Sequence, residues 1–210
     1  MSASVAGVRR RYLGAHLNGG LRADMMAGQT SLLQRTRQLA THEVSFDDSE
    51  CVYSWRPAYT QVWSYIQIRI RLNFDSGVSA ADRAALPIRW KQGIENVWNN
   101  KGGVAGNGES FCGFQFEVQF VTSGEHHQVR VVQGSGATDM GIWHTVDSGN
   151  TAAHEFGHMM GNNDEYTSTA CPSRNPVSTG TIMDNNSNNV PLRMLQPLAD
   201  QLGSIALRNP

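Results

Sequence analysis

The chain has none of the long apolar runs that cross membranes and little of the positive charge that binds nucleic acid. No apolar stretch among its 210 residues approaches the roughly 18 residues that a transmembrane helix needs. Charged residues make up only 17% of the chain and the formal net charge is −1, so no basic surface is expected. The sequence therefore predicts no membrane span and no nucleic-acid partner. Hydrophobic residues make up 40%, which is enough for a globular core.

Cysteine is scarce, with Cys51, Cys112 and Cys171 as the only three residues of this type. The odd count leaves at least one thiol free and allows one disulfide bond. No C-x-x-C pair is present, so a zinc site built from cysteine is not expected. A D-x-D-x-D-G calcium loop is also missing.

The N-terminal sequence lacks the apolar segment of an ordinary signal peptide. The expected location is therefore the cytoplasm, or the outside of the cell after export by an unconventional route, unless the chain is a domain of a longer protein. Residues 1–50 are polar and arginine-rich, and they are interpreted as an N-terminal appendage or pro-segment. Residues 51–210 are expected to form a single domain.

The apolar pattern beyond residue 50 changes between strand and helix periods, which predicts an α+β fold. Apolar residues two apart predict strands, and apolar residues three or four apart predict helices. On this basis strands are expected over 66–72, 114–120, 129–132 and 137–146, and helices over 79–100 and 191–207. Residues 101–108 are glycine-rich and are expected to form a loop. His126 and His127 fall in a predicted turn, where solvation is expected.

The most informative segment begins at His154 and reads His-Glu-Phe-Gly-His-Met-Met-Gly-Asn-Asn-Asp. Its first five residues follow the pattern H-E-x-x-H, which chance would produce in roughly one chain in a hundred of this composition. On a helix, residues four apart lie on the same face, so His154 and His158 can direct two imidazoles at one metal ion. Glu155 is then placed to take a proton from a metal-bound water.

A helix is expected here because Ser148 or Asn150 can cap its start and Gly161 can end it. Glycine readily adopts the left-handed conformation that terminates helices. A sharp turn at Gly161 would return Asp164 to the metal as a third ligand, whereas a longer helix would carry it away. Two histidines and one carboxylate leave a fourth position for water, which is the arrangement of a catalytic zinc site.

This segment resembles the extended zinc signature H-E-x-x-H-x-x-G-x-x-H/D of the metzincin metallopeptidases, in the aspartate variant of snapalysin-like members. Metzincins also carry a methionine turn beneath the metal, and Thr181-Ile182-Met183-Asp184 is similar to it, with Met183 as the turn methionine. The resemblance implies a twisted mixed sheet with backing helices, an active-site helix, the Met-turn and a C-terminal helix. It also implies a zinc ion (Zn²⁺) and a catalytic base, with His154, His158 and Asp164 as the metal ligands and Glu155 as the base.

Two features of the sequence depart from this pattern. The segment ending at Asp184 also resembles the G-T-x-x-D motif of aspzincin peptidases, in which the aspartate binds zinc. Asp184 is therefore an alternative third ligand, although Asp164 fits the metzincin spacing better, and Glu165 is a weaker alternative. Several metzincins also place a tyrosine two residues after the turn methionine, where this chain has Asn185.

The expected function is that of a zinc metalloendopeptidase acting on a protein or peptide substrate, with delivery as a bacterial effector or toxin as one interpretation of the missing signal peptide. The alternatives are a non-catalytic zinc module that binds a protein and an amidase that acts on cell-wall peptides. The edge strand of a metzincin sheet borders the cleft, so residues within Gly136–Thr145 are expected to bind the substrate, unless Ile142 and Trp143 pack in the core. His144 and Tyr166 are candidate donors to the oxyanion.

Overall fold

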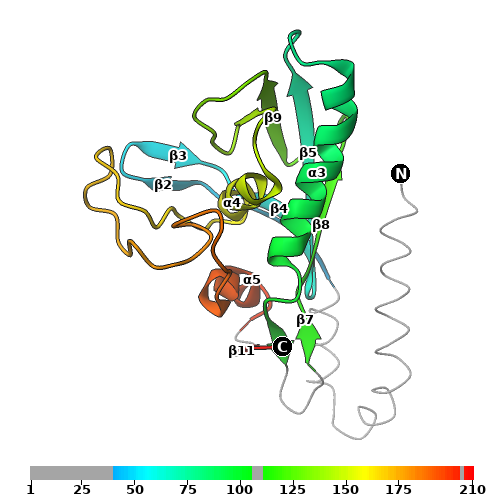
Figure 1. Cartoon of the computed structure of the whole chain (residues 1–210). Helices are drawn as coiled ribbons and strands as arrows, with labels where there is room; N and C mark the ends of the chain where they lie inside the picture. Colours follow the sequence, from blue (N-terminus) through cyan, green and yellow to red (C-terminus); the bar gives the residue numbers. More distant parts are fainter. Residues whose placement is uncertain (1–39, 106–110, 204–205) are drawn as a thin grey trace, which may run out of the picture. The chain divides into compact units, whose positions relative to one another are not determined.

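The computed structural model describes residues 40–105, 111–203 and 206–210, and the compact unit that they form spans Thr41–Pro210. Within these residues the protein is α+β, with a mixed main sheet and three α-helices (Figure 1), which confirms the expected class. No helix in this part of the chain is both long and apolar enough to span a membrane. Residues 1–39, most of the predicted appendage, lie outside the described residues.

The main sheet is built around its longest strand, β5 (Tyr65–Phe74). Along one edge of β5 run antiparallel β4 (Ala58–Val62) and, beyond it, antiparallel β1 (Thr41–Ser45). The other edge is shared by two parallel strands, because β8 (Gln115–Phe120) pairs with residues 65–70 and β9 (His127–Val132) pairs with residues 70–74. The alternating apolar patterns of β5 and β8 thus predicted strands correctly.

The sheet ends at β10 (Ile142–His144), which pairs with β9 in parallel. Only three of the ten residues expected to be extended over 137–146 belong to this strand. Trp143 is fully buried and its ring packs edge-on against Trp90, with ring centroids 4.9 Å apart. Trp143 is therefore a core residue, whereas the segment that precedes β10 stays at the surface.

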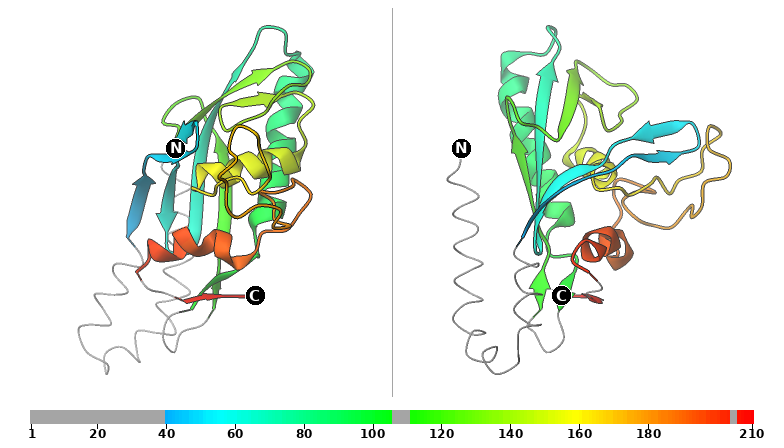
Figure 2. Two further views of the ribbon diagram at one scale, coloured as in Figure 1. Left: turned by 90° about the vertical axis from the view of Figure 1, so that its left-hand side faces the viewer. Right: turned by 180° about the vertical axis from the view of Figure 1, so that it is seen from behind.

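Helix α3 (Ala80–Trp98) lies along one face of the main sheet, as the views in Figure 2 show. Its start is capped by Ser79, whose hydroxyl accepts a hydrogen bond from the backbone N–H of Asp82 at 3.1 Å. Helix α4 (Gly149–Met159) packs against α3 at two glycines, because a Cβ on Gly93 would lie 2.2 Å from the Cα of Gly149. The long helix α3 thus supports the helix that carries the metal-binding motif.

The remaining elements are short. A hairpin of β2 and β3 extends from the β1–β4 pair, a small sheet orders β11, β6 and β7, and a 3-10 turn leads into the last helix. Their bounds are β2 Asp48–Glu50, β3 Tyr53–Trp55, β6 Gly103–Ala105, β7 Cys112–Gly113, η1 Leu192–Leu195, α5 Gln196–Asp200 and β11 Ala206–Arg208.

Three expectations about the chain's organisation differ from the structure. The domain begins at Thr41 rather than at residue 51, because β1 pairs with β4 in the main sheet. The C-terminal helix expected over 191–207 is only η1 and α5, because the chain turns at Gly203, whose φ is 77°, and returns as β11. Residues 103–105 of the predicted glycine-rich loop form β6, which pairs with β11 and β7.

Candidate metal centre

The helix that carries the H-E-x-x-H motif is α4, and its two ends are those expected from the sequence. At its start, the hydroxyl of Ser148 accepts a hydrogen bond from the backbone N–H of Thr151 at 3.1 Å. At its end, Gly161 has a φ of 94° and donates its N–H to the carbonyl of His158 at 3.0 Å. The N–H of Asn162 donates to the carbonyl of Gly157 at 3.0 Å, which completes a Schellman motif. The chain therefore reverses here and returns toward the helix.

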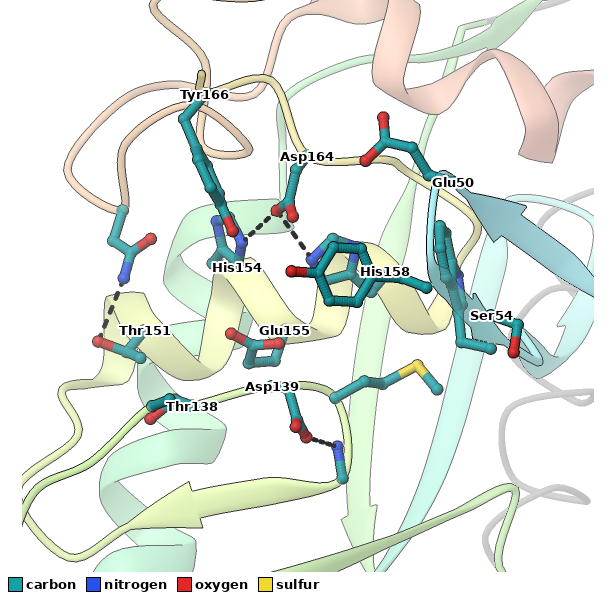
Figure 3. A pocket seen from close by; sticks show the side chains of 16 residues that line it. Glu50, Ser54, Thr138, Asp139, Thr151, His154, Glu155, His158, Asp164 and Tyr166 are labelled. Atoms are coloured by element: carbon teal, nitrogen blue, oxygen red, sulfur yellow. Dashed lines mark hydrogen bonds and ion pairs between the residues drawn. The ribbon is translucent and has the colours of Figure 1, made fainter. Parts of the chain in front are cut away.

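This reversal brings Asp164 to the two motif histidines (Figure 3). The Nε2 atoms of His154 and His158 each lie 3.1 Å from Oδ1 of Asp164. Ligand atoms of all three side chains lie within 4.8 Å of one another, and among the described residues no other cluster of His, Cys, Asp or Glu side chains meets this geometry. The structure thus brings together the three residues that the sequence predicted as metal ligands.

The hydrogen bonds behind the two imidazoles fit a metal ion in front of them. Nδ1 of His154 lies 2.8 Å from the carbonyl oxygen of Ile182, and Nδ1 of His158 lies 2.8 Å from that of Asn162. A carbonyl oxygen can only accept, so each Nδ1 donates its proton, and in the neutral imidazole each Nε2 then has a lone pair for a metal ion. In a tetrahedral zinc site the donor atoms lie about 3.3–3.6 Å apart, and each histidine nitrogen lies 3.1 Å from Oδ1 of Asp164, which is close to that spacing.

The electrostatics of the cluster favour a positive charge between the three side chains. Burial lowers the pKa of His154, but the hydrogen bond to Asp164 and the negative charge of Glu155 raise it above its ordinary value overall. Burial raises the pKa of Asp164, but its hydrogen bonds to His154 and His158 outweigh that effect and hold its pKa well below the usual range. A proton or a metal cation would each satisfy this preference.

Arg174 holds the other oxygen of the Asp164 carboxylate. Its guanidinium donates to Oδ2 of Asp164 at 3.1 Å, to Glu50 at 2.7 Å and to the carbonyl oxygen of Tyr166 at 2.9 Å. The Arg174 side chain is only 2% exposed, and its guanidinium carbon lies 4.7 Å above the ring of Tyr166. Because Oδ2 is engaged in this way, Oδ1 is the oxygen that Asp164 presents to the histidines.

The two alternative third ligands are engaged elsewhere. The carboxylate of Asp184 accepts a hydrogen bond from the N–H of Gly180 at 3.0 Å, within its own turn. Glu165 is buried, and it pairs with Arg193 and accepts hydrogen bonds from the hydroxyls of Thr179 and Thr181. Neither residue belongs to the cluster, so the geometry favours Asp164.

Glu155 lies beside the cluster with one oxygen that is not hydrogen-bonded. The residue is 4% exposed, and its Oε2 atom has no hydrogen-bond partner among the described residues. Burial raises the pKa of Glu155, which the positive charge of the two histidines only partly opposes. An unpaired buried carboxylate oxygen is costly to stability, and its place beside the three candidate ligands makes Glu155 a candidate functional residue.

The cluster opens into a cleft of about 670 Å³. One wall is the segment from Ala137 to Gly141, and the facing wall is the hairpin of β2 and β3, which contributes Glu50, Tyr53, Ser54 and Trp55. The ring of Trp55 lies edge-on to that of His158, with ring centroids 5.8 Å apart. A cleft with these two walls is large enough to hold part of an extended chain.

The predicted methionine turn lies directly beneath α4. Met183 is fully buried, and a Cβ on Gly157 would come within 2.5 Å of its sulfur atom. The same turn supplies the Ile182 carbonyl that orients His154 and the Met183 carbonyl that accepts from the N–H of Glu165 at 2.8 Å. The turn therefore orients His154, one candidate ligand, and Glu165, which directly follows the candidate ligand Asp164.

The structure separates the two oxyanion candidates. Tyr166 lines the cleft, and its ring centroid lies 6.4 Å from that of His154. Burial and the negative charge of Asp164 raise the pKa of Tyr166 to about 12, so its hydroxyl keeps the proton that it could donate. His144 is buried away from the cleft lining, and its Nδ1 lies 3.1 Å from the hydroxyl of Thr138.

Sequence reasoning missed the residues that surround the cluster from other parts of the chain. These are Glu50, Trp55 and Arg174, together with the disulfide bond between Cys51 and Cys171. No family model, curated protein or solved structure matches this chain. The chemistry of the site is therefore inferred from its own residues.

Proposed function

We propose that the protein is a zinc-dependent endopeptidase of the metzincin type. One observation carries this proposal: two imidazole nitrogens and one carboxylate oxygen converge beside a buried carboxylate that has a free oxygen, in an open cleft. The α+β fold, the helix reversal at Gly161 and the buried Met183 below Gly157 support the same type. A purely structural zinc site has four protein ligands and no need of a base, whereas this cluster has three ligands and Glu155.

In this proposal His154, His158 and Asp164 would hold the zinc ion. When bound, zinc supplies Lewis acidity: it polarises a carbonyl group and lowers the pKa of a water molecule toward 7. Glu155 lies next to the first ligand and lines the cleft, so its carboxylate can accept the proton of the attacking water. The same carboxyl group can then pass the proton to the amine nitrogen that leaves.

Tyr166 is the residue that we assign as hydrogen-bond donor to the oxyanion. Its ring contacts both His154 and the guanidinium of Arg174, and the residue lines the cleft. Metzincins that use a tyrosine for this purpose carry it after the turn methionine, where this chain has Asn185. Tyr166 would supply the equivalent group from the loop that follows Asp164.

Substrate assays with controlled metal content test the proposal. The purified protein is incubated with denatured casein and, separately, with purified peptidoglycan, before and after removal of metal with a chelator and after zinc is added back. The proposal predicts that casein is cut, that the chelator abolishes the cleavage and that zinc restores it. Release of peptides from peptidoglycan alone would indicate a cell-wall amidase, and bound zinc without cleavage of either substrate would indicate a non-catalytic module.

A further inference from the structure

The sheet edge that the sequence predicted as the substrate-binding strand is not open. The backbone N–H of Ile142 donates to the carboxylate of Asp139 at 2.8 Å, and the N–H of His144 donates to that of Asp147 at 2.6 Å. The preceding turn is also closed, since the N–H of Gly141 donates to Asp139 at 2.7 Å. An extended peptide needs unpaired N–H and C=O groups to add to a sheet, and this edge has its donors satisfied internally.

The facing wall of the cleft is different, because β3 borders it with three consecutive residues. Tyr53, Ser54 and Trp55 all line the cleft. Tyr53 and Trp55 share one face of the hairpin with Glu50, which pairs with Tyr53, and this face lines the cleft. Ser54 directs its side chain to the opposite face, so its place in the lining puts the backbone edge of β3 at the border of the cleft. Because β3 pairs with β2 alone, its other edge is free within the described residues.

The hairpin register shows which backbone groups lie on that free edge. Glu50 pairs with Tyr53 across the two-residue turn, and Ser49 pairs with Ser54. In a two-residue hairpin the residues that flank the turn exchange the ladder hydrogen bonds, so the next pair points its N–H and C=O groups outward. The N–H of Ser49 agrees with this, because it donates to the side chain of Asp48 at 2.8 Å instead of to β3. Ser54 therefore directs its backbone N–H and C=O to the free side of β3.

The hairpin is fixed relative to the candidate metal ligands. The disulfide bond joins Cys51 of its turn to Cys171 of the loop that follows Asp164. Arg174 bridges Glu50 of β2 and Asp164, and Trp55 of β3 lies against His158. Figure 3 shows Ser54 at the rim of the same cavity as the three ligands. A chain bound along β3 would thus be held at a constant distance from the reacting centre.

We propose that an extended stretch of the substrate peptide pairs with the free edge of β3, through the backbone N–H and C=O of Ser54. This proposal rests on the proposed endopeptidase function and names how that site takes its substrate. The recognised feature is an unfolded segment of protein chain, because backbone pairing needs an extended conformation and does not depend on the side chains. A folded substrate would have to expose such a segment before it is cut.

Hydrogen exchange measured at single backbone amides tests the pairing of the peptide with β3, and it needs no substitution in β3. The probe is a synthetic peptide that spans a site which the wild-type protein cuts in casein, bound to the zinc-loaded Glu155→Gln variant. The proposal predicts that the peptide slows exchange of the Ser54 amide at least about tenfold, while the Ser49 amide on the opposite edge of the hairpin is unchanged. Unchanged exchange at Ser54 in the saturated complex would overturn the proposal.

Proline substitutions on the two edges of the hairpin give a second test. Ser54→Pro removes the N–H on the free edge of β3, and Ser49→Pro removes the matching N–H on the outer edge of β2. Ser54→Pro is expected to raise KM about two- to tenfold with little change in kcat or zinc content, since one hydrogen bond to the peptide is lost. Ser49→Pro should keep the wild-type KM.

The outcomes separate this inference from the proposed function. If the wild-type protein cuts no peptide, the endopeptidase function fails. If it cuts peptides but Ser54→Pro binds and cuts them as the wild type does, the function stands and the role of β3 is wrong. An equal rise in KM in Ser54→Pro and Ser49→Pro would also contradict the role of β3, because the change would then come from disruption of the whole hairpin.

Discussion

The buried side chain of Arg174 forms an ion pair with Asp164, in which one carboxylate oxygen contacts the arginine and the other faces the two histidines. Oδ2 of Asp164 accepts from Arg174 at 3.1 Å, while Oδ1 lies 3.1 Å from both histidine nitrogens. The same guanidinium reaches Glu50 at 2.7 Å, so Arg174 links Asp164 to the cleft hairpin. Outer groups of this kind set the orientation of metal ligands and are often nearly as important as the ligands themselves.

Replacement of Arg174 should therefore weaken metal binding without removing a ligand. Arg174→Met is expected to lower zinc affinity about 10- to 100-fold, because Asp164 would rotate freely and the carboxylates of Asp164 and Glu50 would lose their shared partner. Titration with zinc against a competing chelator measures the change. Arg193→Met, which breaks the pair of Arg193 with Glu165, serves as the control for loss of a nearby arginine. Equal zinc affinity in Arg174→Met and the wild type would contradict this role.

The identity of the third ligand is tested by two alanine variants. Asp164→Ala is expected to lose zinc, because its carboxylate is the only acidic group in the cluster of the described residues. Asp184→Ala is expected to keep zinc, because Asp184 bonds to Gly180 within its turn. The metal content of the two purified variants distinguishes them, and the reverse pattern would move the site to the aspzincin arrangement.

Gly161 should be necessary for both stability and metal binding. Its φ of 94° is unfavourable for any residue with a side chain, and a Cβ there would lie 2.7 Å from Phe46. Gly161→Ala is expected to lower the free energy of unfolding by about 1–2 kcal/mol and to reduce zinc affinity. Gly134→Ala is the matched control, because Gly134 has a φ of 88° but its Cβ would meet nothing within 4 Å. That variant should lose stability but keep its zinc affinity.

His127 should make the protein less stable in mild acid. Burial lowers its pKa to about 4, and its Nε2 lies 2.9 Å from the carbonyl oxygen of Ala58. In the unfolded chain His127 is protonated below about pH 6.5, whereas in the folded protein it stays neutral down to about pH 4. The neutral, buried His127 therefore contributes its full stabilisation above pH 6.5, and this stabilisation is lost as the pH falls from 6.5 to 4.

Urea unfolding of the wild type and of His127→Gln at a series of pH values measures this effect. The stability advantage of the wild type over the variant is expected to shrink by about 3 kcal/mol between pH 7 and pH 4. Other titrating groups change both proteins alike and cancel in the difference. Parallel pH profiles for the two proteins would contradict a neutral, buried His127.

The sequence predicted those parts of the site whose structure depends only on neighbouring residues in the chain. The spacing of His154 and His158 and the left-handed Gly161 depend on the helix and its end, so the sequence indicates them directly. The sequence offered Ser148 or Asn150 as the cap, and the structure has Ser148 there. The alternating residues of β5 and β8 likewise predicted two strands of the main sheet.

Parts that depend on distant contacts could not be predicted in this way. Arg174 reaches Glu50 and Cys171 bonds to Cys51, but nothing near either residue indicates its partner more than a hundred positions away. His127 was expected to be solvated in a turn, yet it opens β9 and is buried. Residues 103–105 were predicted to be a loop because one of their pairing partners, β11, is distant in the sequence and lies near the C-terminus.

The Glu155→Gln variant tests the central claim most directly. The amide keeps the size of the carboxyl group but cannot accept a proton from water, and it leaves the three ligands unchanged. Zinc content and casein cleavage are measured side by side on the wild type and the variant. The account predicts a full complement of zinc in both proteins and a loss of cleavage by at least about 100-fold in the variant. Cleavage at the wild-type rate by a zinc-loaded Glu155→Gln protein would contradict it.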